Sequence, residues 1–400
     1  MKYTLQQLSQ QPNALADHYR EFNVAGRLLL TGHSHQAWPD VAFDGMKQAW
    51  HDAATLVDDK WGPAFEKAEA VRKGYASIIE DTDGHIALAP NTHDLVLRFL
   101  SALPLKKKPK IVTTDGEFHT VRRQLARLEE EGIGVVRVAT NPIQQVVEKI
   151  IDAIDDKTSA VIVSAVFYET GLILPELAAL AEACNRKGVY LLVDAYHALN
   201  AIPFTIKRLK LQQAFIIGGG YKYCQLGEGN CFMRFPADCK LRPVITGWFS
   251  EFSMIADKNT GTTAYGQGHD LFAGSTYDPI SHYRAAAVFQ FFRKHGLSPE
   301  FLREVSQHQT ALLAKTFLDT DIPEHIISLD TSIKHEQRAG FLVLKTDHAA
   351  WFYKQLHKEG VLTDYRGNSL RLGPAPYLTD NQLKYSMGVL TDIADYFPGS

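Results

Sequence analysis

Two residues that end or follow apolar strings, Asp194 and Lys222, carry the functional groups that a pyridine-aldehyde cofactor requires. Asp194 closes the string Val189-Tyr-Leu-Leu-Val-Asp194, and Lys222 lies in Phe215-Ile-Ile-Gly-Gly-Gly-Tyr-Lys-Tyr223. A lysine amine can form a Schiff base with pyridoxal phosphate (PLP), and a carboxylate near the pyridine nitrogen keeps the ring protonated and electron-accepting. Parallel α/β sheets present such groups at the carboxyl ends of their strands. We therefore predict that Asp194 and Lys222 are catalytic and bind PLP.

Composition and charge are consistent with an enzyme of two domains that acts on a small molecule. The chain has 400 residues, of which 45% are hydrophobic and 22% charged, as in globular proteins with a large core. The net charge of -3 gives no electrostatic reason to expect nucleic acid as a partner. The three lysines at residues 106–108 form a short run that is typical of a solvated loop.

The sequence also gives no sign of a membrane segment, a secreted fold or a metal site. The N-terminal string Met-Lys-Tyr-Thr-Leu-Gln-Gln has no apolar signal core. The apolar stretches, such as residues 160–167, are far shorter than the roughly 20 residues that span a bilayer. The four cysteines, Cys184, Cys224, Cys231 and Cys239, show no paired metal spacing and fit reduced thiols. We expect a cytoplasmic protein with no membrane partner and no metal.

The middle of the chain alternates strand and helix patterns. Short β-rich runs are predicted at residues 86–90, 110–115, 134–140, 159–167, 189–195, 214–219 and 230–235. Helical patterns separate several of them; one covers residues 175–187, with Pro175 in its first turn and Gly188 as a stop. This alternation predicts an α/β fold with a mostly parallel sheet and helices on both faces.

The pattern changes after residue 278. Long amphipathic helices are predicted at residues 278–295 and 298–318, the second with Ser298 as N-cap. A smaller unit follows, with strands at 340–345 and 369–372, a helix at 347–358, and a C-terminal helix from Thr379. We predict an N-terminal helical arm (1–50), a large PLP-binding α/β domain (51–290) and a small C-terminal α+β domain (291–400).

Several short strings, in the order of the chain, resemble the class V aminotransferase branch of fold type I PLP-dependent enzymes, and within it the kynureninases. They are Asn91-Thr-His-Asp94, Glu117-Phe-His119, Asp194-Ala-Tyr-His-Ala-Leu-Asn-Ala-Ile-Pro203, Tyr221-Lys-Tyr223, Gly227-Glu-Gly-Asn230, Gly247-Trp248 and Leu370-Arg371-Leu-Gly-Pro374-Ala-Pro376-Tyr377. The matches run from about residue 30 to residue 377. The resemblance implies a PLP-dependent transferase fold, an amino acid substrate and a homodimer with shared active sites.

The resemblance also implies roles for individual cofactor-binding residues. Asn91 and Thr92 open a helix whose free N–H groups and dipole suit the cofactor phosphate, although the same residues would also make an ordinary N-cap. Phe118 is expected to stack on the pyridine ring, and Tyr221 to reach a phosphate oxygen. His197 would hold Asp194 or touch the cofactor, with a purely structural histidine as the alternative. In the family, the counterpart of Trp248 reaches the phosphate of the neighbouring subunit.

The substrate-binding segments depart from the family pattern. The counterpart of Arg371 binds the substrate α-carboxylate, for which a guanidinium fork is suited. The family's early Gly-Asn-Ser-Leu-Gly string appears here as Gly32-His33-Ser34-His35-Gln36, and we assign His35 to substrate binding. The aspartate of Phe-Pro-Thr-Asp is missing at Phe118-His-Thr-Val121. The asparagine that helps recognise an aryl ketone is replaced near Ser275-Thr-Tyr-Asp-Pro279.

Three hypotheses therefore stand at this point. The first is a kynureninase-like hydrolase that cleaves the Cβ–Cγ bond of a β-acyl amino acid. The second is another PLP reaction, in particular a class V aminotransferase or a lyase. The desulfurase variant of it is disfavoured because all four cysteines precede residue 240, whereas persulfide chemistry needs a mobile cysteine later in the chain. The third is a non-enzymatic sensor, which the intact Lys222 and Asp194 pair argues against.

Overall fold

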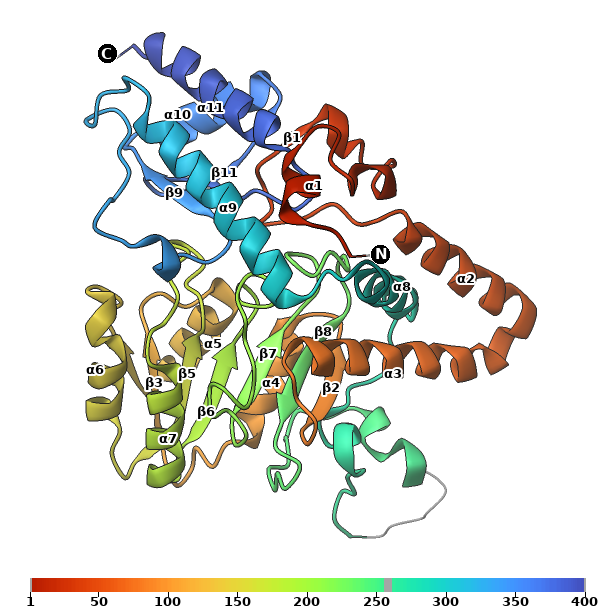
Figure 1. Cartoon of the computed structure of the whole chain (residues 1–400). Helices are drawn as coiled ribbons and strands as arrows, with labels where there is room; N and C mark the ends of the chain where they lie inside the picture. Colours follow the sequence, from red (N-terminus) through yellow and green to blue (C-terminus); the bar gives the residue numbers. More distant parts are fainter. Residues whose placement is uncertain (1, 255–260, 399–400) are drawn as a thin grey trace.

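The computed structural model describes residues 2–254 and 261–398. Within them, one large sheet has the strand order β2-β8-β7-β6-β5-β3-β4. All neighbouring pairs are parallel except those of β8, which runs antiparallel to β7 and β2. The mostly parallel sheet that the sequence predicts is thus confirmed (Figure 1). The strands are β2 (His85–Ala89), β3 (Lys110–Thr114), β4 (Gly134–Val138), β5 (Thr158–Ser164), β6 (Tyr190–Asp194), β7 (Phe215–Gly218) and β8 (Cys231–Phe235).

The interior strand β5 is buried at every position because helices cover both faces of the sheet. Successive side chains of a strand point to opposite faces. Accordingly, Val161 and Val163 belong to one core with residues of α6 and α7, while Ala160 and Ile162 belong to a second core with residues of α4 and α5. These helices are α4 (Thr92–Ala102), α5 (His119–Glu130), α6 (Val146–Ala153) and α7 (Leu177–Lys187).

The predicted start of α7 at Pro175 is wrong by two residues. Glu176 adopts a left-handed conformation with φ of 53°, so regular helical geometry begins only at Leu177. At the other end, Gly188 is left-handed with φ of 60° and stops the helix as predicted.

Two long helices connect the large sheet with a smaller C-terminal unit. They are α8 (Ile280–His295) and α9 (Pro299–Leu318), and Ser298 caps α9 by accepting a hydrogen bond from Phe301 N, as predicted. The C-terminal unit contains an antiparallel sheet in the order β11-β12-β9, made of β11 (Asp364–Arg366), β12 (Ser369–Leu372) and β9 (Leu342–Lys345). Helices α10 (Ala349–Lys358) and α11 (Asp380–Asp395) accompany this sheet. The pairing of β11 with β12 places Asp364 opposite Arg371.

The N-terminal segment runs along the C-terminal unit before it enters a pair of long helices. After α1 (Leu5–Ser9), strand β1 (Leu28–Leu29) pairs in parallel with β10 (Val361–Leu362). Gly32 N then donates to Gly373 O at 2.7 Å, and a Cβ at Gly32 would lie 2.5 Å from Pro374 O, so only glycine fits this approach. The long helices that follow are α2 (Val41–Leu56) and α3 (Trp61–Ile78).

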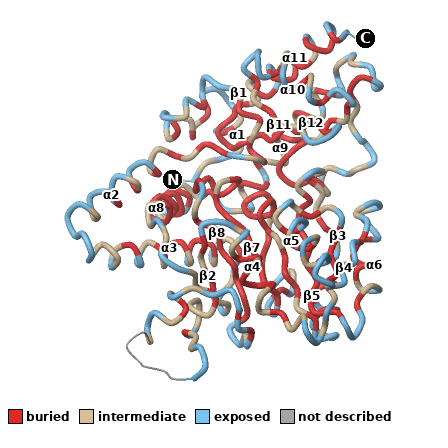
Figure 2. The backbone as a smooth tube through the Cα atoms, turned by 180° about the vertical axis from the view of Figure 1, so that it is seen from behind, coloured by how far each residue is buried: buried red, intermediate tan, exposed pale blue. Residues whose placement is uncertain are grey.

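The backbone is most buried in the sheet and in α8, while α2 is largely exposed (Figure 2). Short 3₁₀ helices complete the chain at Ala16–His18, Val24–Gly26, Val57–Lys60, Ile143–Gln145, Trp248–Met254, Gly268–Phe272 and His335–Gln337. In the part of the chain that the structure describes, no helix combines the length and hydropathy needed to cross a bilayer.

Candidate active site

Lys222 lies just beyond the carboxyl end of β7, enclosed by groups from three separate parts of the chain. Its side chain is buried, with 8% of the residue exposed. Its Nζ lies 2.9 Å from His197 Nε2 and donates a hydrogen bond to the carbonyl oxygen of His33 at 3.2 Å. The ring centroids of Tyr196 and Tyr221 are 5.5 and 5.4 Å from Nζ. The amine is thus held in one place by fixed neighbours.

These surroundings favour the neutral form of the Lys222 amine. Burial lowers the pKa of Lys222 to about 7, and the positive charge of Arg371 contributes in the same direction. The carboxylates of Asp194 and Asp364 act against this shift. Because a nucleophilic or basic lysine must lose its proton, a pKa near neutrality prepares Lys222 for both roles.

Asp194, the last residue of β6, is partly buried and has no ion-pair partner among the described residues. Its Oδ1 accepts a hydrogen bond from Tyr196 N at 2.8 Å. Burial raises the pKa of Asp194 to about 6, although the Tyr196 bond and the charge of Lys222 oppose this shift. A carboxyl of this kind would be stabilised as the anion by a cationic N–H group, which a protonated pyridine supplies. Asp194 and Lys222 therefore fit PLP in chemistry and in position.

His197 contacts the lysine rather than Asp194. Its Nε2 is the atom that lies 2.9 Å from Lys222 Nζ, while its Nδ1 has no hydrogen-bond partner in the described part of the chain. Burial and the neighbouring Lys222 charge lower the pKa of His197 well below its usual value, so the ring is neutral. A buried imidazole nitrogen without a partner at this place is available to a cofactor atom.

The residues predicted to bind the phosphate lie at the start of α4, in the loop after β7 and, for Trp248, in the 3₁₀ helix Trp248–Met254. Asn91 is the N-cap of α4, and its Oδ1 accepts a hydrogen bond from Asp94 N at 2.9 Å; the first N–H groups of the helix remain as candidate phosphate donors. Tyr221 stacks on the His35 ring at a centroid distance of 4.7 Å. The N-cap alternative for Asn91 is confirmed, and it is compatible with phosphate binding by Thr92 and the following N–H groups.

Trp248 stands apart from this cluster. Its side chain is 44% exposed, its Nε1 donates to Thr276 Oγ1 at 3.3 Å, and its ring packs against Phe249 and Phe252. Among the described residues, no contact joins Trp248 to Lys222. The structure therefore does not bring Trp248 into the site of its own chain.

Phe118 is the N-cap residue of α5 and lies beyond the carboxyl end of β3. Its ring meets the Tyr168 ring edge-on at a centroid distance of 5.3 Å and lies at the same distance from the His119 ring. Strand β3 is separated from β6 only by β5, so the Phe118 turn lies at the same edge of the sheet as Asp194, two strands away.

Arg371 is buried and already holds two oxygen partners. Its Nε and Nη2 donate to Asp364 Oδ1 at 3.3 and 2.7 Å, and its Nη1 donates to the carbonyl oxygen of Tyr168 at 2.5 Å. A guanidinium has five N–H groups, and these bonds use three of them. Two N–H groups, one on each Nη, are left for a further acceptor such as a carboxylate.

His33 and His35 have different surroundings although one residue separates them. His33 is fully buried, its ring stacks on Phe341 at 4.6 Å, and neither ring nitrogen has a hydrogen-bond partner in the described residues. Burial and the charges of Arg371 and Lys222 lower its pKa well below the usual range. His35 is more exposed, and its Nε2 lies 3.7 Å from Glu228 Oε1. The described residues contain no group of three or more potential metal ligands.

Sequence reasoning missed four contributors to this site. They are the backbone carbonyl of His33, the Tyr196 ring, the Asp364 carboxylate on Arg371, and the buried Glu117 near Asp194. The His33 string was visible as a departure from the family, and Glu117 stood next to Phe118. No signal in the sequence pointed to Asp364, because its pairing depends on the register of β11 with β12.

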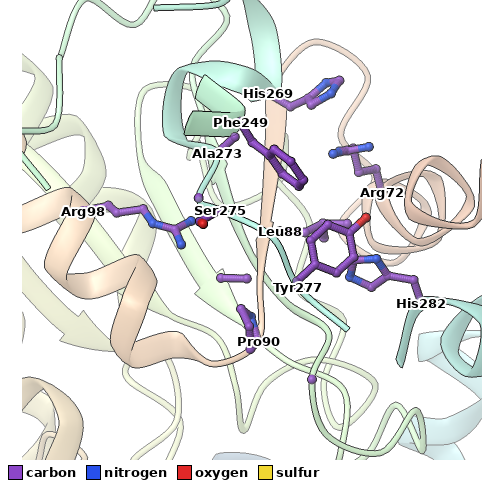
Figure 3. Close-up of a pocket in the computed structure, with 13 residues that line it drawn as sticks. Arg72, Leu88, Pro90, Arg98, Phe249, His269, Ala273, Ser275, Tyr277 and His282 are labelled. Atoms are coloured by element: carbon purple, nitrogen blue, oxygen red, sulfur yellow. The ribbon is translucent and has the colours of Figure 1, made fainter. Parts of the chain in front are cut away.

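A separate cavity of about 50 Å³ lies beside the edge strand β2 (Figure 3). Arg98 of α4 borders it on one side, and Arg72 of α3 and His282 of α8 on the other, with the rings of Phe249 and Tyr277 between them. None of the predicted site residues lines it. Its walls include the segment around Ser275, which follows Trp248 and is predicted to approach a second subunit.

The fold and this arrangement of lysine, aspartate and histidine define a PLP-dependent enzyme of fold type I. Comparison with protein families gives the same class: the aminotransferase class-V model matches residues 62–298, and the model of the kynureninase C-terminal domain matches residues 302–390. The first match alone covers more than half of the chain. The protein therefore belongs to the class V aminotransferase family, binds PLP, and carries a kynureninase-type C-terminal domain.

Relatives and solved structures agree with this assignment. An uncharacterized aminotransferase of Bacillus subtilis is 24% identical over 85% of this chain and 87% of its own length. A kynureninase of Bacillus cereus is 24% identical over 89% of this chain and 82% of its own. A C-DES mutant with glycine covalently linked to its PLP cofactor has a TM-score of 0.78 at 15% identity, over 94% of this chain and 98% of its own. A cysteine desulfurase of Thermococcus onnurineus, solved in the apo form, has the same TM-score at 16% identity, over 99% and 100%. The last two similarities show the fold alone.

The pKa of Lys222 yields a first prediction. Apoenzyme mixed with PLP should capture the cofactor covalently with a pH midpoint near 7, because the neutral amine falls about tenfold for each pH unit below its pKa. Visible absorbance from pH 5.5 to 9, with borohydride reduction and peptide mapping to Lys222, measures this. Arg371→Gln should move the midpoint upward, since it removes a like charge. A midpoint above pH 9 would contradict the prediction.

Asp194 yields a second prediction. Asp194→Asn should still capture PLP at Lys222 but lose roughly 10²–10³-fold in turnover, because the carboxylate that stabilises the protonated ring is gone. Cofactor content by absorbance, measured beside steady-state rates, separates the two effects. Turnover close to that of the wild type in this variant would show that Asp194 only ends a strand.

Proposed function

We propose that the protein is a kynureninase-like hydrolase that cleaves the Cβ–Cγ bond of a β-acyl amino acid and releases alanine and a carboxylic acid. The observation that carries this proposal is the match of the kynureninase C-terminal domain to residues 302–390, since this stretch contains Arg371. Curated kynureninases of several Bacillus species, 23–26% identical, support it. The four cysteines are free thiols, which fits the cytoplasmic location that we propose.

Arg371 would bind the substrate α-carboxylate through its two remaining N–H groups. Asp364 and the Tyr168 carbonyl hold the guanidinium from the other sides, so that its orientation is set before substrate arrives. Its charge also lowers the pKa of Lys222. The same residue would thus position the substrate and keep the base beside it unprotonated.

Lys222, His197 and Asp194 would have different roles in the reaction at the substrate α-carbon. PLP, when bound, supplies an electron sink for the pair that remains when a bond at this carbon breaks. Lys222 Nζ would take and return the α-proton, with His197 Nε2 at 2.9 Å to keep the amine in line. Asp194 would stay ionised against the ring nitrogen, and Phe118 would hold the ring from one face. Tyr221, Asn91 and Thr92 would bind the phosphate end.

An aminotransferase is the second candidate. The Bacillus subtilis relative is described as an aminotransferase, and transamination would use the same Lys222, Asp194 and Arg371. The replaced asparagine near Tyr277 and Asp278 also weakens the case for an aryl ketone substrate. Persulfide chemistry is disfavoured, because burial raises the pKa of the Cys184 and Cys231 thiols to about 12 and leaves them protonated.

We also propose a homodimer in which Trp248 reaches the cofactor of the partner subunit. Trp248 is half exposed and does not contact Lys222 of its own chain. The chain around Trp248 carries further exposed apolar side chains: Val244, Ile245 and Phe252. An apolar surface of this kind is typical of a contact with another protein.

The substrate proposal predicts the effect of Arg371→Ala. This variant should keep PLP but lose about 2–5 kcal/mol of substrate interaction, roughly a 30- to 5,000-fold fall in kcat/KM. Arg366→Ala is the matched control, because Arg366 is half exposed and lies 3.5 Å from the same Asp364 oxygen; it should change kcat/KM far less. Products are identified by mass spectrometry of a kynurenine and amino acid panel. Formation of a keto acid without alanine would replace the hydrolase by the aminotransferase.

The shared site predicts complementation between two inactive variants. Lys222→Ala and Trp248→Ala homodimers should each be impaired, while subunits exchanged between them should form hybrids with one intact site. In that site, Lys222 comes from one chain and Trp248 from the other. Light scattering should give the mass of a dimer for each sample. Mixtures that gain no activity, although mass spectrometry detects hybrids, would place Trp248 in its own subunit's site or outside both sites.

A further inference from the structure

Glu117 is a buried acid that none of the roles above uses. It lies in the turn between β3 and α5, directly before Phe118, and is 2% exposed. Its Oε1 accepts hydrogen bonds from Thr114 Oγ1 at 2.6 Å and from Ser164 N at 3.1 Å, and its Oε2 accepts one from Ser164 Oγ at 2.7 Å. The carboxyl thus bonds to the end of its own strand and to the end of β5.

The partner strand end leads directly to Asp194. Ser164 lies opposite Asp194 in the register of β5 with β6, and Ala165 N donates to Asp194 O at 2.9 Å. The turn has little freedom to move away, because a Cβ on Gly116 would lie 2.8 Å from the Phe167 ring and 2.9 Å from Thr140. Glu117 therefore connects the Phe118 turn to the strand end beside Asp194.

Glu117 has no cationic neighbour to balance its charge among the described residues. In the described parts of the chain it forms no ion pair; the groups that face it are the hydroxyls of Thr114 and Ser164 and the carboxyl of Asp194. Burial raises the pKa of Glu117 to about 7 although the hydrogen bonds from Ser164 and Thr114 favour the anion, and the charge of Asp194 adds to the rise. Two neighbouring carboxyls in a buried site do not readily ionise together.

We propose that Glu117 is a positioning residue that ties the Phe118 turn to the end of β5 and stays protonated there while Asp194 ionises. With the proton on Glu117 Oε2, this O–H donates to Ser164 Oγ while Oε1 still accepts from Thr114 Oγ1 and Ser164 N, and Asp194 is free to be the anion that a pyridinium nitrogen requires. The inference rests on the proposed roles of Asp194 and Phe118. It adds a residue that acts through both without touching the substrate.

The proton-holding role predicts how holoenzyme stability varies with pH in Glu117→Gln. The folded pKa lies above the usual value of 4.5, so the favourable contribution of Glu117 is present below pH 4.5 and is lost as pH rises through about 7. Glutamine cannot ionise, yet its carbonyl can still accept from Ser164 N and Thr114. The Tm of Glu117→Gln minus that of the wild type should therefore rise between pH 5 and pH 8. A difference that stays constant over this range would overturn the proton-holding role.

Glu304→Gln, at an exposed position of α9, is the matched control and should follow the wild type across the same range. The positioning role is tested by Glu117→Ala, which removes all three bonds. This variant should alter the visible circular dichroism of bound PLP and release PLP faster, whereas Glu117→Gln should retain both properties. A Glu117→Ala holoenzyme with wild-type dichroism and PLP release would overturn this role. None of these measurements depends on turnover, so they can fail while the hydrolase proposal stands, and the reverse.

Discussion

The neutral amine of Lys222, buried among histidine, tyrosine and charged side chains, is the condition on which the rest of the site depends. An ammonium group in this place would lose its hydration and would face the guanidinium of Arg371. Both effects lower its pKa to about 7. The protein can hold the uncharged form by two contacts, His197 Nε2 and the carbonyl of His33. The two contacts come from different segments of the chain. Both segments must be in place before the amine has these neighbours.

The contact of Lys222 with the carbonyl of His33 depends on the course of the N-terminal segment. Residues 31–36 must pass between the C-terminal unit and the lysine loop, and the backbone contact of Gly32 with Gly373 and Pro374 leaves no room for a side chain. The pairing of β1 with β10 anchors the same segment. Meanwhile β12 brings Arg371 from the opposite direction and fastens it to Asp364. The site therefore forms only when the sheet, the N-terminal segment and the C-terminal unit have all folded together.

The sequence predicted those features that depend on local pattern. The strands of the large sheet, the cap at Ser298 and the stop at Gly188 follow from hydrophobic periodicity and backbone preference, and the structure confirms them. The start of α7 was missed because glutamate has no preference for the left-handed conformation that Glu176 adopts. Asp364 and the His33 carbonyl were missed for a different reason. The contact of Asp364 with Arg371 depends on the register of two strands, and the contact of His33 with Lys222 uses a backbone oxygen. The identities of the side chains predict neither.

The same distinction applies to the side chain at position 33. Lys222 bonds to the carbonyl of His33, not to its ring, so any residue that keeps the backbone path of Gly32 preserves this contact. The imidazole of His33 is therefore not needed for this contact. Burial, together with the charges of Arg371 and Lys222, lowers the pKa of this ring, whose nitrogens accept or donate no hydrogen bond among the described residues although Nε2 lies 3.9 Å from Asp364 Oδ2. Because the His33 ring is neutral, it can donate or accept a hydrogen bond without competing with the Arg371 guanidinium for a bound carboxylate. The side chain at position 33 can therefore differ without loss of the backbone contact that holds the lysine amine.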